Sequence, residues 1–411
     1  MMKAEKNIPE LRFPEFDGEW HEKTLGEISL KIGSGSTPKG GEEVYQTVGI
    51  PFIRSQNIVD NQLILDDTCI PKDVHDRMSG SKVLSNDVLL NITGASIGRS
   101  CVVPKNFQEG NVNQHVSIIR LKKYNPIFLQ LFIASHKGQK LIYEGQTGSG
   151  REGLNFESIK RFKISFPSTP EQQKIASFLS SVDQRIQLLT QKKEQLEQYK
   201  KGVMQQIFSR QLRFKDEQGK EYPEWEEKRL GDISIIFKGK GISKEDITPG
   251  GHIECIRYGE LYTFYKETII DVVSKTSQQS KELIFSKKHD VIIPASGETQ
   301  IDIARASCVM KDGVALGGDL NIIRTDLNGV YLAYYINGAL KYEIAKAAQG
   351  ISVIHLYGSQ LRDLKIKLPS KIEQQKIASF LSFIDDKITH VNTQIEQTRK
   401  WKQGLLQKMF I

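Results

Sequence analysis

The chain has little of what metalloenzymes, secreted proteins and membrane proteins usually carry. Its 411 residues include four cysteines and eight histidines, all scattered without the close spacing of a metal site or a disulfide framework. No apolar run approaches the roughly 18 residues that span a membrane, and the opening MMKAEKNIPELRF contains no apolar segment of signal-peptide type. We therefore expect a cytoplasmic protein with buried thiols, no membrane segment and no metal.

Motifs for catalysis and cofactor binding are equally scarce. Residues 148–153 match the glycine spacing of a dinucleotide-binding loop, but they follow a helical stretch, whereas that loop lies between a strand and a helix. Residues 145–150 lack the Lys-Ser/Thr ending of a P-loop. The chain also has no Asn-Pro-Pro or Asp-Pro-Pro motif of the amino-methyltransferase type, no nuclease carboxylate–lysine cluster and no nucleophile elbow. We predict a binding or adaptor protein without catalytic residues or a cofactor of its own.

The charge balance is basic, but only mildly so. The net charge is +8 and the isoelectric point is near 9.0. This is compatible with an anionic partner such as DNA, although a non-specific DNA coater would usually be more basic, and it is equally compatible with an ordinary basic protein. With 38% hydrophobic residues over this length, the chain can form two or three globular domains with ample core.

One decapeptide occurs twice. EQQKIASFLS occupies residues 171–180 and again 373–382, and an alignment of 171–208 with 373–410 needs no gap. Upstream, LGEIS returns as LGDIS, and KISFPS returns as KIKLPS. A period of about 200 residues is too long for a solenoid repeat. A whole unit, a globular domain followed by a helix, therefore occurs twice.

The repeated segments predict two long helices. Apolar residues alternate at spacings of three and four, which is the pattern of a heptad seam. The seam comprises Ile175, Leu179, Val182, Ile186 and Leu189 in the first helix and Ile377, Leu381, Ile384, Ile388 and Val391 in the second; Lys193 and Lys200 also fall on it. About 38 residues would measure roughly 55–60 Å, more than a domain of this size. The alternative is an amphipathic helix that lies on its own domain, but we expect antiparallel pairing of the two repeats.

The remaining sequence favours mixed domains. Residues 83–90, 117–121 and 162–166 are strand-like, and residues 128–144 and 330–348 are helix-like. The fold class we expect is α+β, with two similar mixed α/β domains separated by two long helices that pair as an antiparallel coiled coil. The expected boundaries are 1–170 for the first domain, 171–210 for the first helix, 211–372 for the second domain and 373–411 for the second helix.

Loops of both domains carry side chains suited to DNA. Hydroxyls, lysines and glycine amides bind phosphates, and arginine, glutamine and asparagine bind base edges. The candidates in the first domain are Lys31, Ser34, Ser36, Thr37, Lys39, Arg54, Gln56, Asn57, Thr93, Ser96, Arg99, Asn113, Gln114, His115 and Arg151. Those in the second are Lys238, Lys240, Ser243, Arg257, Tyr258, Ser296, Thr299, Gln300 and Arg305. The alternative for any one of them is a solvated loop residue or a turn hydrogen bond. The helices are alike and these loops differ, so the helices face something symmetric and the domains face two different things.

The layout of domain, EQQKIASFLS helix, domain and EQQKIASFLS helix resembles the specificity subunit of type I restriction–modification systems, which defend cells against foreign DNA. The Gly-Ser-Thr-Pro loop and DVLLNITGASIGRS add to the resemblance, whereas Gly-Lys-Gly-Ile-Ser replaces the first of these in the second half. The resemblance implies two target recognition domains, each reading half of a split double-stranded DNA site. It also implies partners: two modification subunits that bind S-adenosylmethionine and methylate adenine, and restriction subunits that use ATP and Mg²⁺.

Two other classes of protein remain open from the residues themselves. A methyltransferase or nuclease acting alone would bind S-adenosylmethionine or turn over DNA. A coiled-coil scaffold with two protein-binding modules would show no sequence-selective affinity for DNA. The missing catalytic motifs argue against the first class.

Overall fold

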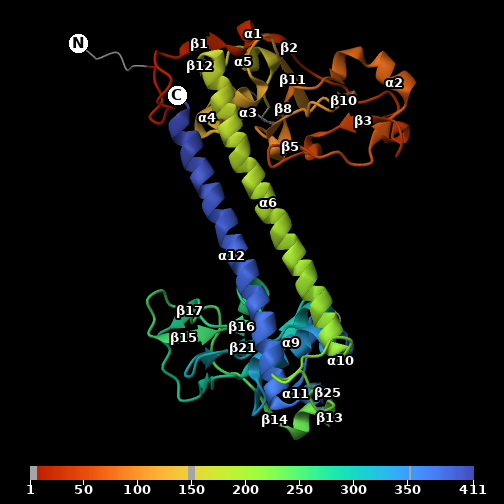
Figure 1. Cartoon of the computed structure of the whole chain (residues 1–411), viewed down its shortest axis with the longest axis vertical. Coiled ribbons are helices and arrows are strands. Elements are labelled where there is room, and N and C mark those ends of the chain that lie inside the picture. The colour runs from red at the N-terminus through yellow and green to blue at the C-terminus, as the bar shows by residue number, and fades with distance from the viewer. Residues whose placement is uncertain (1–6, 147–152, 351–352) are drawn as a thin grey trace, which may run out of the picture. The chain divides into compact units, whose positions relative to one another are not determined.

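The computed structural model describes residues 7–146, 153–350 and 353–411, which fold into two compact units (Figure 1). Unit 1 comprises residues 1–189 and 394–411, and unit 2 comprises residues 190–393. Each unit contains a globular part, the beginning of one long helix and the end of the other. Segments far apart in the sequence therefore complete each unit.

Unit 1 is built on two small sheets. The first is antiparallel, in the order β2 (Ser29–Ser34), β11 (Val116–Leu121), β8 (Val88–Asn91), β9 (Ser100–Val102). The second has the order β6 (Cys69–Ile70), β3 (Ile50–Ile53), β10 (Gly110–Val112), β7 (Lys82–Val83), with β3 and β10 parallel. Two ribbons join β1 (His21–Thr24) to β12 (Lys163–Phe166), and β4 (Ile58–Val59) to β5 (Gln62–Leu63).

Unit 2 repeats this plan. Its first sheet has the order β14 (Ser234–Lys238), β23 (Leu320–Thr325), β19 (Val291–Pro294), β21 (Ser307–Val309), β16 (Thr268–Ile269). Its second has the order β17 (Ser274–Thr276), β15 (Ile253–Ile256), β22 (Ala315–Leu316), β18 (Ile284–Phe285), again with a parallel central pair. Ribbons join β13 (Glu226–Arg229) to β25 (Lys365–Leu368), and β20 (Ser296–Gly297) to β24 (Ile354–His355). The expected α+β class with two similar mixed domains is confirmed.

Short helices pack on these sheets, and two long helices follow the globular parts. In unit 1 the short helices are α1 (Leu25–Ile28), α2 (Lys72–Arg77), α3 (Pro126–Ala134), α4 (His136–Gly145) and α5 (Phe156–Lys160). In unit 2 they are α7 (Glu260–Thr263), α8 (Gln300–Ile303), α9 (Gly329–Tyr335), a π-helical turn (Ile336–Leu340), α10 (Lys341–Ala347) and α11 (Gly358–Arg362). The long helices are α6 (Thr169–Phe208) and α12 (Lys371–Met409).

A buried carboxylate explains why the strand motifs recur. In unit 1, Asp87 precedes β8, is fully buried and forms a two-pronged ion pair with Arg120 of β11 at 2.7 Å. In unit 2, Asp290 precedes β19 and pairs in the same way with Arg324 of β23. Each pair joins two neighbouring strands. Because a buried charge without its partner is strongly destabilising, the acid and the base have to be present together in both repeats.

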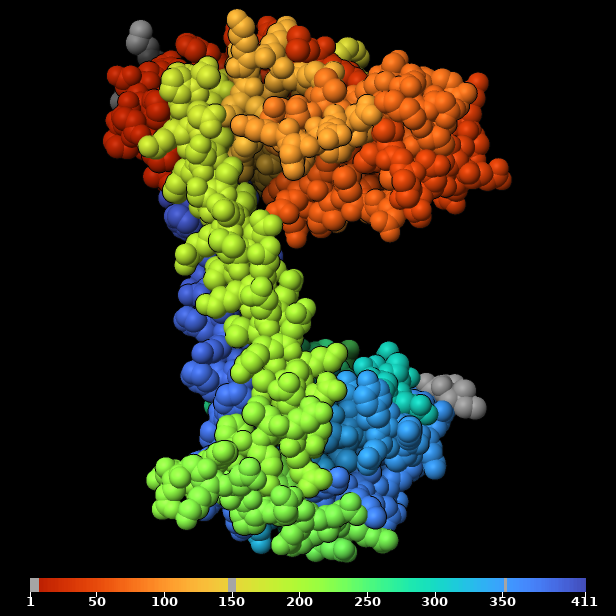
Figure 2. All heavy atoms as spheres, turned by 45° about the vertical axis from the view of Figure 1, so that its right-hand side comes forward, coloured from red at the N-terminus to blue at the C-terminus, as the bar shows by residue number. Residues whose placement is uncertain are grey.

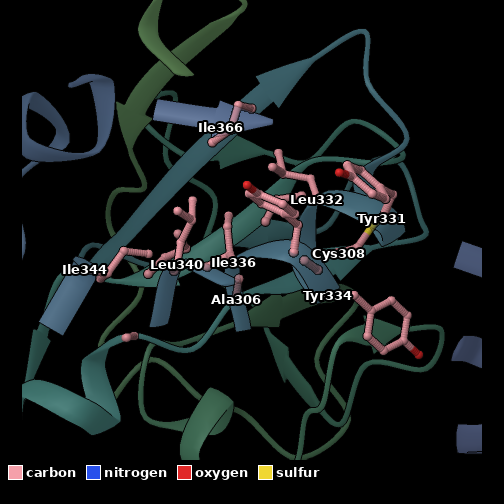
Figure 3. Close-up of a cluster of buried hydrophobic side chains, with 14 of the residues drawn as sticks. Ala306, Cys308, Tyr331, Leu332, Tyr334, Ile336, Leu340, Ile344 and Ile366 are labelled. Atoms are coloured by element: carbon pink, nitrogen blue, oxygen red, sulfur yellow. The ribbon is translucent and has the colours of Figure 1, made fainter. Parts of the chain in front are cut away.

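The core of unit 2 lies between its first sheet and α9. Ile366 of β25, Cys308 of β21 and Leu332 of α9 are fully buried together, whereas Tyr334 points away from the other labelled side chains (Figure 3). The hydroxyl of Tyr334 instead bonds to Asp385 of α12 within the same unit. The helix α9 therefore packs on the sheet by one face and holds the long helix by another.

The repeated decapeptide fixes the start of each long helix to its own globular part. In unit 1 the carboxylate of Glu171 is buried and accepts two bonds of 2.7 Å from Arg12, together with one of 3.4 Å from the indole of Trp20. The red N-terminal segment accordingly lies beside the yellow-green start of α6 in Figure 2. In unit 2, Glu373 accepts bonds of 3.2 Å from both Arg213 and Trp225.

The two glutamines of the motif complete this attachment. In unit 1 the side chain of Gln172 donates to the carbonyl of Pro167 at 2.9 Å and accepts the amide of Asn125 at 3.1 Å. Gln173 accepts a bond of 2.8 Å from the side chain of Asn125, the residue that also caps α3. Unit 2 makes the same bonds through Gln374, Gln375 and Asn328. The motif therefore recurs because both helices begin in the same hydrogen-bonded socket.

Each unit pairs the beginning of one long helix with the end of the other, which makes the pairing antiparallel. In unit 1 the seam residues Ile175, Leu179 and Val182 share a buried cluster with Leu405 and Met409, and Ile186 packs against it. In unit 2 the apolar cluster joins Ile377, Leu381, Ile384 and Ile388 of α12 with Leu196, Val203 and Ile207 of α6. Of the other predicted seam residues, Val391 is buried and Leu189 is half-buried.

Lysines on this seam have polar partners. Lys402 Nζ lies 2.6 and 2.8 Å from the carboxylate oxygens of Asp183 in unit 1. Lys200 lies 2.8 Å from both oxygens of Asp385 in unit 2. The ungapped alignment equates Lys200 with Lys402, and Asp183 with Asp385, so the two ion pairs are one contact made twice. Lys193 donates to Asn392 at 2.9 Å.

Within residues 7–146, 153–350 and 353–411, none of the helices is both long enough and apolar enough to traverse a lipid bilayer. The same ranges contain no group of histidine, cysteine and carboxylate side chains that could hold a metal ion.

Candidate nucleic-acid interface

Four loops of unit 1 that carry predicted DNA-binding residues are neighbours. The loops are residues 35–39, 54–57, 92–99 and 113–115, which follow β2, β3, β8 and β10. The amide of Gly35 donates to the carbonyl of Asn113 at 3.1 Å, and the amide of Asn113 donates to that of Ile53 at 3.0 Å. The amide of Ile92 donates to the carbonyl of His115 at 3.0 Å. The framework thus gathers loops that are up to 80 residues apart in the sequence.

A chain of side-chain hydrogen bonds runs across three of these loops. Thr37 Oγ1 donates to Gln114 Oε1 at 2.7 Å, and Gln114 Nε2 lies 3.0 Å from His115 Nε2. Thr93 Oγ1 lies 2.6 Å from Nδ1 of the same imidazole, while Asn113 Oδ1 accepts the His115 amide at 3.0 Å. Hydroxyl, amide and imidazole groups can exchange such bonds for bonds to a base edge or a phosphate.

A second group surrounds Asp66. Arg54 Nη2 lies 2.7 Å from Asp66 Oδ2 and 2.6 Å from Thr68 Oγ1, and Gln56 Nε2 donates to the same carboxylate at 3.1 Å. Burial alone would raise the pKa of Asp66, but hydrogen bonds from Thr68, Arg54 and Gln56 together lower it below its ordinary value. The buried Asn57 uses both ends of its amide to shape this turn. Contact of these residues with bases stays a prediction and requires these bonds to be exchanged.

Asn91 joins the two groups and was missed by the sequence reasoning. It is fully buried at the end of β8, and its Nδ2 donates to the carbonyl of Ser55 at 2.9 Å and to Ser96 Oγ at 3.1 Å. It therefore holds the loop of Ser96 against the turn of Arg54. The signal available in the sequence was a lone amide directly after three apolar strand residues, where a buried polar group must find partners.

The other predicted residues of unit 1 are less closely linked. Ser36 and Lys39 are exposed in the first loop, and Ser34 Oγ bonds to the carbonyl of Gly35 at 3.3 Å. Lys31 instead lies along β2, where it donates to the carbonyl of Gly80 at 2.6 Å and burial lowers its pKa. Arg99 is exposed at the end of its loop. Arg151 lies outside the described residues.

A glycine is required at the start of the first loop in each unit. A Cβ atom on Gly35 would lie 1.6 Å from the carbonyl oxygen of Val112, and one on Gly239 would lie 2.1 Å from that of Gly317. Both distances are far below van der Waals contact with backbone that cannot easily move. The glycines that the sequence offered as phosphate-binding amides are thus needed first for close passage of two chain segments.

Unit 2 gathers the equivalent loops in the same way. The amides of Gly239 and Lys240 donate to the carbonyls of Leu320 and Leu316 at 2.9 Å, and the amide of Gly317 donates to that of Ile256 at the same distance. The predicted residues Tyr258, Ser296 and Arg305 line a pocket of about 570 Å³. Arg305 is held there by bonds of 3.0 and 3.1 Å to two backbone carbonyls.

Most other predicted residues of unit 2 are paired with carboxylates. Lys240 lies 3.0 Å from Glu282, and Arg257 lies 3.1 Å from the buried Glu260. The hydroxyls of Ser243 and Thr299 donate to Asp246 and Asp302 at 2.7 and 2.6 Å. Lys238 and Gln300 are exposed. The loops of unit 2 thus offer fewer uncompensated cations than their sequence indicated.

The side chains of both loop clusters are of kinds that can bind a ligand without reacting with it. They present hydroxyls, amides, guanidinium groups and tyrosines, which are hydrogen-bonding and stacking groups. Burial raises the pKa of the Cys101 thiol and that of the Cys308 thiol to about 12, which favours their protonated forms. A reactive cysteine needs a lowered pKa instead. Two similar frameworks, each holding a different set of polar loops, define a recognition protein.

Comparison with known proteins identifies the kind of recognition. The family model of the type I restriction modification DNA specificity domain matches residues 17–198 and 222–398. The chain therefore belongs to this family, as a specificity subunit of a type I restriction–modification system, and the resemblance drawn from the repeated motifs is confirmed.

Relatives match along most of the chain. The putative type I restriction enzyme MjaX specificity subunit of Methanocaldococcus jannaschii is 23% identical over 98% of this chain and 95% of its own length. The MjaIX specificity subunit of the same organism is 24% identical over 95% and 92%. Among solved structures, the S subunit of a type I restriction–modification system from M. genitalium matches with a TM-score of 0.62 at 16% identity, over 98% of this chain and 99% of that one.

Proposed function

We propose that the two globular parts read the two halves of a bipartite, asymmetric DNA site, one half each. Recognition is assigned to residues 1–170 and 211–372, and spacing and subunit docking to the helices within 171–210 and 373–411. The observation that carries the proposal is the contrast between the repeats. The sheet frameworks and helix sockets are alike in both units, whereas the loops on the frameworks carry different side chains. Two different readers imply an asymmetric target.

The loops of unit 1 suit direct reading of base edges. A bidentate contact between arginine and guanine is worth about 1–3 kcal/mol of discrimination against the wrong base. Arg54 is held by Asp66 in the free chain, so a guanine would have to replace the carboxylate. With an incorrect base, Arg54 would stay paired with Asp66 and would contribute no binding free energy. Discrimination by Arg54 therefore comes from a choice between an internal partner and the DNA.

The chemistry belongs to partner subunits. Two modification subunits would dock on the helix pair, bring S-adenosylmethionine and methylate an adenine flipped out of the duplex. Restriction subunits that use ATP and Mg²⁺ would join the same complex. We assign neither a catalytic residue nor a cofactor to this chain. The repeated helices support a partner present in two copies, because equivalent surfaces occur once in each unit.

The experiment is a methylome comparison. The chain is expressed with its modification subunits in cells that lack other adenine methylation, and methylated motifs are read by sequencing. We expect one motif with two defined halves and an undefined spacer. In a second strain, residues 1–170 are replaced by the corresponding domain of a relative with a known target. The first half of the motif should change and the second should not.

Two outcomes would contradict the proposal. A motif that changes in both halves after the exchange would show that the domains do not read independently. Label transfer from S-adenosylmethionine to DNA by the purified chain alone would show that the chain is itself an enzyme.

A further inference from the structure

A hollow in unit 1 lies where the loop after β8 meets the end of α12. Its volume is about 360 Å³, and three cationic side chains line it: Arg99 from the loop, and Arg399 and Lys402 from the helix. The charge of Lys402 is matched by Asp183, which lies 2.6 Å away. Across the described part of the chain, no carboxylate lies within ion-pair distance of Arg99 or Arg399. The hollow therefore holds two guanidinium groups without a counter-charge.

The walls of the hollow are fixed in place. Gln139 of α4 lines it and donates to the carbonyl of Gly98 at 3.1 Å and to that of Ile133 at 2.8 Å. These bonds tie the loop of Arg99 to the helical layer of the domain. Gln403 and Asn61 add two further amide side chains to the lining. Guanidinium and amide groups facing one small space form a donor-rich surface, which favours an anionic ligand.

The equivalent hollow of unit 2 carries carboxylates among its cations. It has a volume of about 380 Å³ and is lined by Lys200, which bonds to both Glu267 and Asp385, and by Lys266 and Arg305, the latter held by two backbone carbonyls. Glu197 also lines it and occupies the position that Arg399 has in the other repeat. This one helix position thus carries a negative charge in unit 2 and a positive charge in unit 1. The difference lies in a helix whose other features are repeated, so it is not a consequence of the diverged domains.

We propose that the hollow of unit 1 binds a phosphodiester of the DNA backbone, so that the end of α12 contacts DNA as well as pairing with α6. The proposal rests on the proposed DNA-reading role of unit 1. The loop of Arg99 is one of the four gathered at the candidate interface, so the hollow continues that surface onto the helix. Arginine binds phosphate through two parallel hydrogen bonds, and such contacts set register without reading sequence. Unit 2 lacks the site, so the two units make unequal numbers of phosphate contacts with their half-sites.

The test uses the full chain assembled with its modification subunits. Affinity for a duplex carrying the methylated motif is measured between 50 and 200 mM salt for the native complex, for Arg399→Gln and for the matched control Glu197→Gln. Arg399 is exposed, so its replacement should not disturb folding. Loss of one phosphate contact lowers the slope of log K against log salt by about 0.9. The loss of affinity over this range should therefore be about 3-fold smaller for Arg399→Gln, for specific and non-specific DNA alike, and unchanged for Glu197→Gln.

A second arm identifies the ligand as a backbone phosphate. Neutral methylphosphonates are introduced singly along the first half-site and the adjoining spacer. One position should weaken the native complex and have no further effect on Arg399→Gln. Unchanged salt slopes for Arg399→Gln would overturn the inference. So would weaker assembly of Arg399→Gln with the modification subunits in the absence of DNA, which would place a carboxylate of the partner in the hollow. Failure of the native complex to bind its motif would instead reject the proposed function.

Discussion

A chain that ends at Arg210 should dimerise and recognise a palindrome. Residues 394–411 complete unit 1 in the intact chain, and their equivalents in the first repeat are residues 192–209. A second copy of the half-chain can therefore supply the missing segment. In the buried cluster, Leu405, Met409 and Phe410 would be replaced by Val203, Ile207 and Phe208 of the other copy. These are apolar substitutions of similar size, which cores tolerate well.

The ion pair of the seam is retained in such a dimer. Lys200 of one copy takes the place of Lys402 against Asp183 of the other, and two-fold symmetry produces the contact twice. A variant that reverses one charge of the pair, Asp183→Lys or Lys200→Asp, would break the contact at both places. The carboxylate of Asp183 is partly exposed, at 38%, so each broken contact should cost about 1–2 kcal/mol, below the range of fully buried pairs. The dimer of such a variant would lose about 2–4 kcal/mol of binding free energy, which is roughly a 30- to 1,000-fold increase in Kd.

The assay uses two half-chains with opposite changes. Asp183→Lys alone places lysine against lysine, and Lys200→Asp alone places aspartate against aspartate. A mixture restores both pairs, because each copy supplies the residue that the other lacks. We expect sedimentation to show dimers for the unchanged half-chain and for the mixture, at concentrations where either variant alone is monomeric. Co-expressed with modification subunits, the unchanged half-chain should methylate the first half-site followed by its inverse complement.

The reasoning would be refuted if both variants dimerised as well as the unchanged half-chain. It would also be refuted if the mixture dimerised no better than its components, since the seam pair would then not set the partnership. Methylation of the asymmetric site of the intact chain by the half-chain would contradict the assignment of one half-site to each unit.

Three further predictions follow from the contacts described. Glu171→Ala should lower the free energy of unfolding by about 3 kcal/mol, measured with denaturant, because it removes the buried carboxylate to which Arg12 and Trp20 donate, whereas Arg12 keeps its bonds to the carbonyls of Asp17 and Gly18. The same change at an exposed helix position should cost under 0.5 kcal/mol. Arg54→Ala should relax sequence preference in one half of the methylated motif, at a cost of about 1–3 kcal/mol in binding free energy. The control Lys39→Ala should weaken binding to all sequences equally. An equally uniform loss for Arg54→Ala would show that Arg54 has only a structural role. One heptad inserted after Leu189 and one after Thr393 should lengthen the spacer by about three base pairs, since seven helical residues add roughly 10.5 Å; an unchanged spacer would show that the helices do not set it.

The long-range organisation was predictable because it is encoded in a repeat. Each side chain of EQQ has a partner in its own globular part, from Arg12 in the first unit to Arg213 in the second, so the whole motif is retained in both copies. The heptad seam was predictable from spacing. The polar partners of its lysines were not, because Asp183 and Lys402 lie over 200 residues apart.

The loops were harder to interpret from sequence. Composition pointed to the gathered loops, but it could not show which side chains are already engaged within the fold. Asp66 holds Arg54 and Gln56 from another loop, and Glu260 holds Arg257. Asn91 was overlooked because its function is to join two loops, and only their proximity reveals it. Individual partners depend on tertiary placement, which local residue types do not specify.

The completion of unit 1 by residues 394–411 has a consequence for synthesis of the protein. The buried cluster around Phe128 and Ile175 includes Met409 and Phe410, which are synthesised long after the rest of that unit. About 200 residues separate the first segment of unit 1 from its second, so at 5–20 residues per second the nascent domain waits roughly 10–40 s with apolar surface uncovered. During that interval it is a natural client for chaperones. A ribosome that stops before residue 394 releases a chain whose first unit is incomplete, although every residue of that unit's sheets has been made.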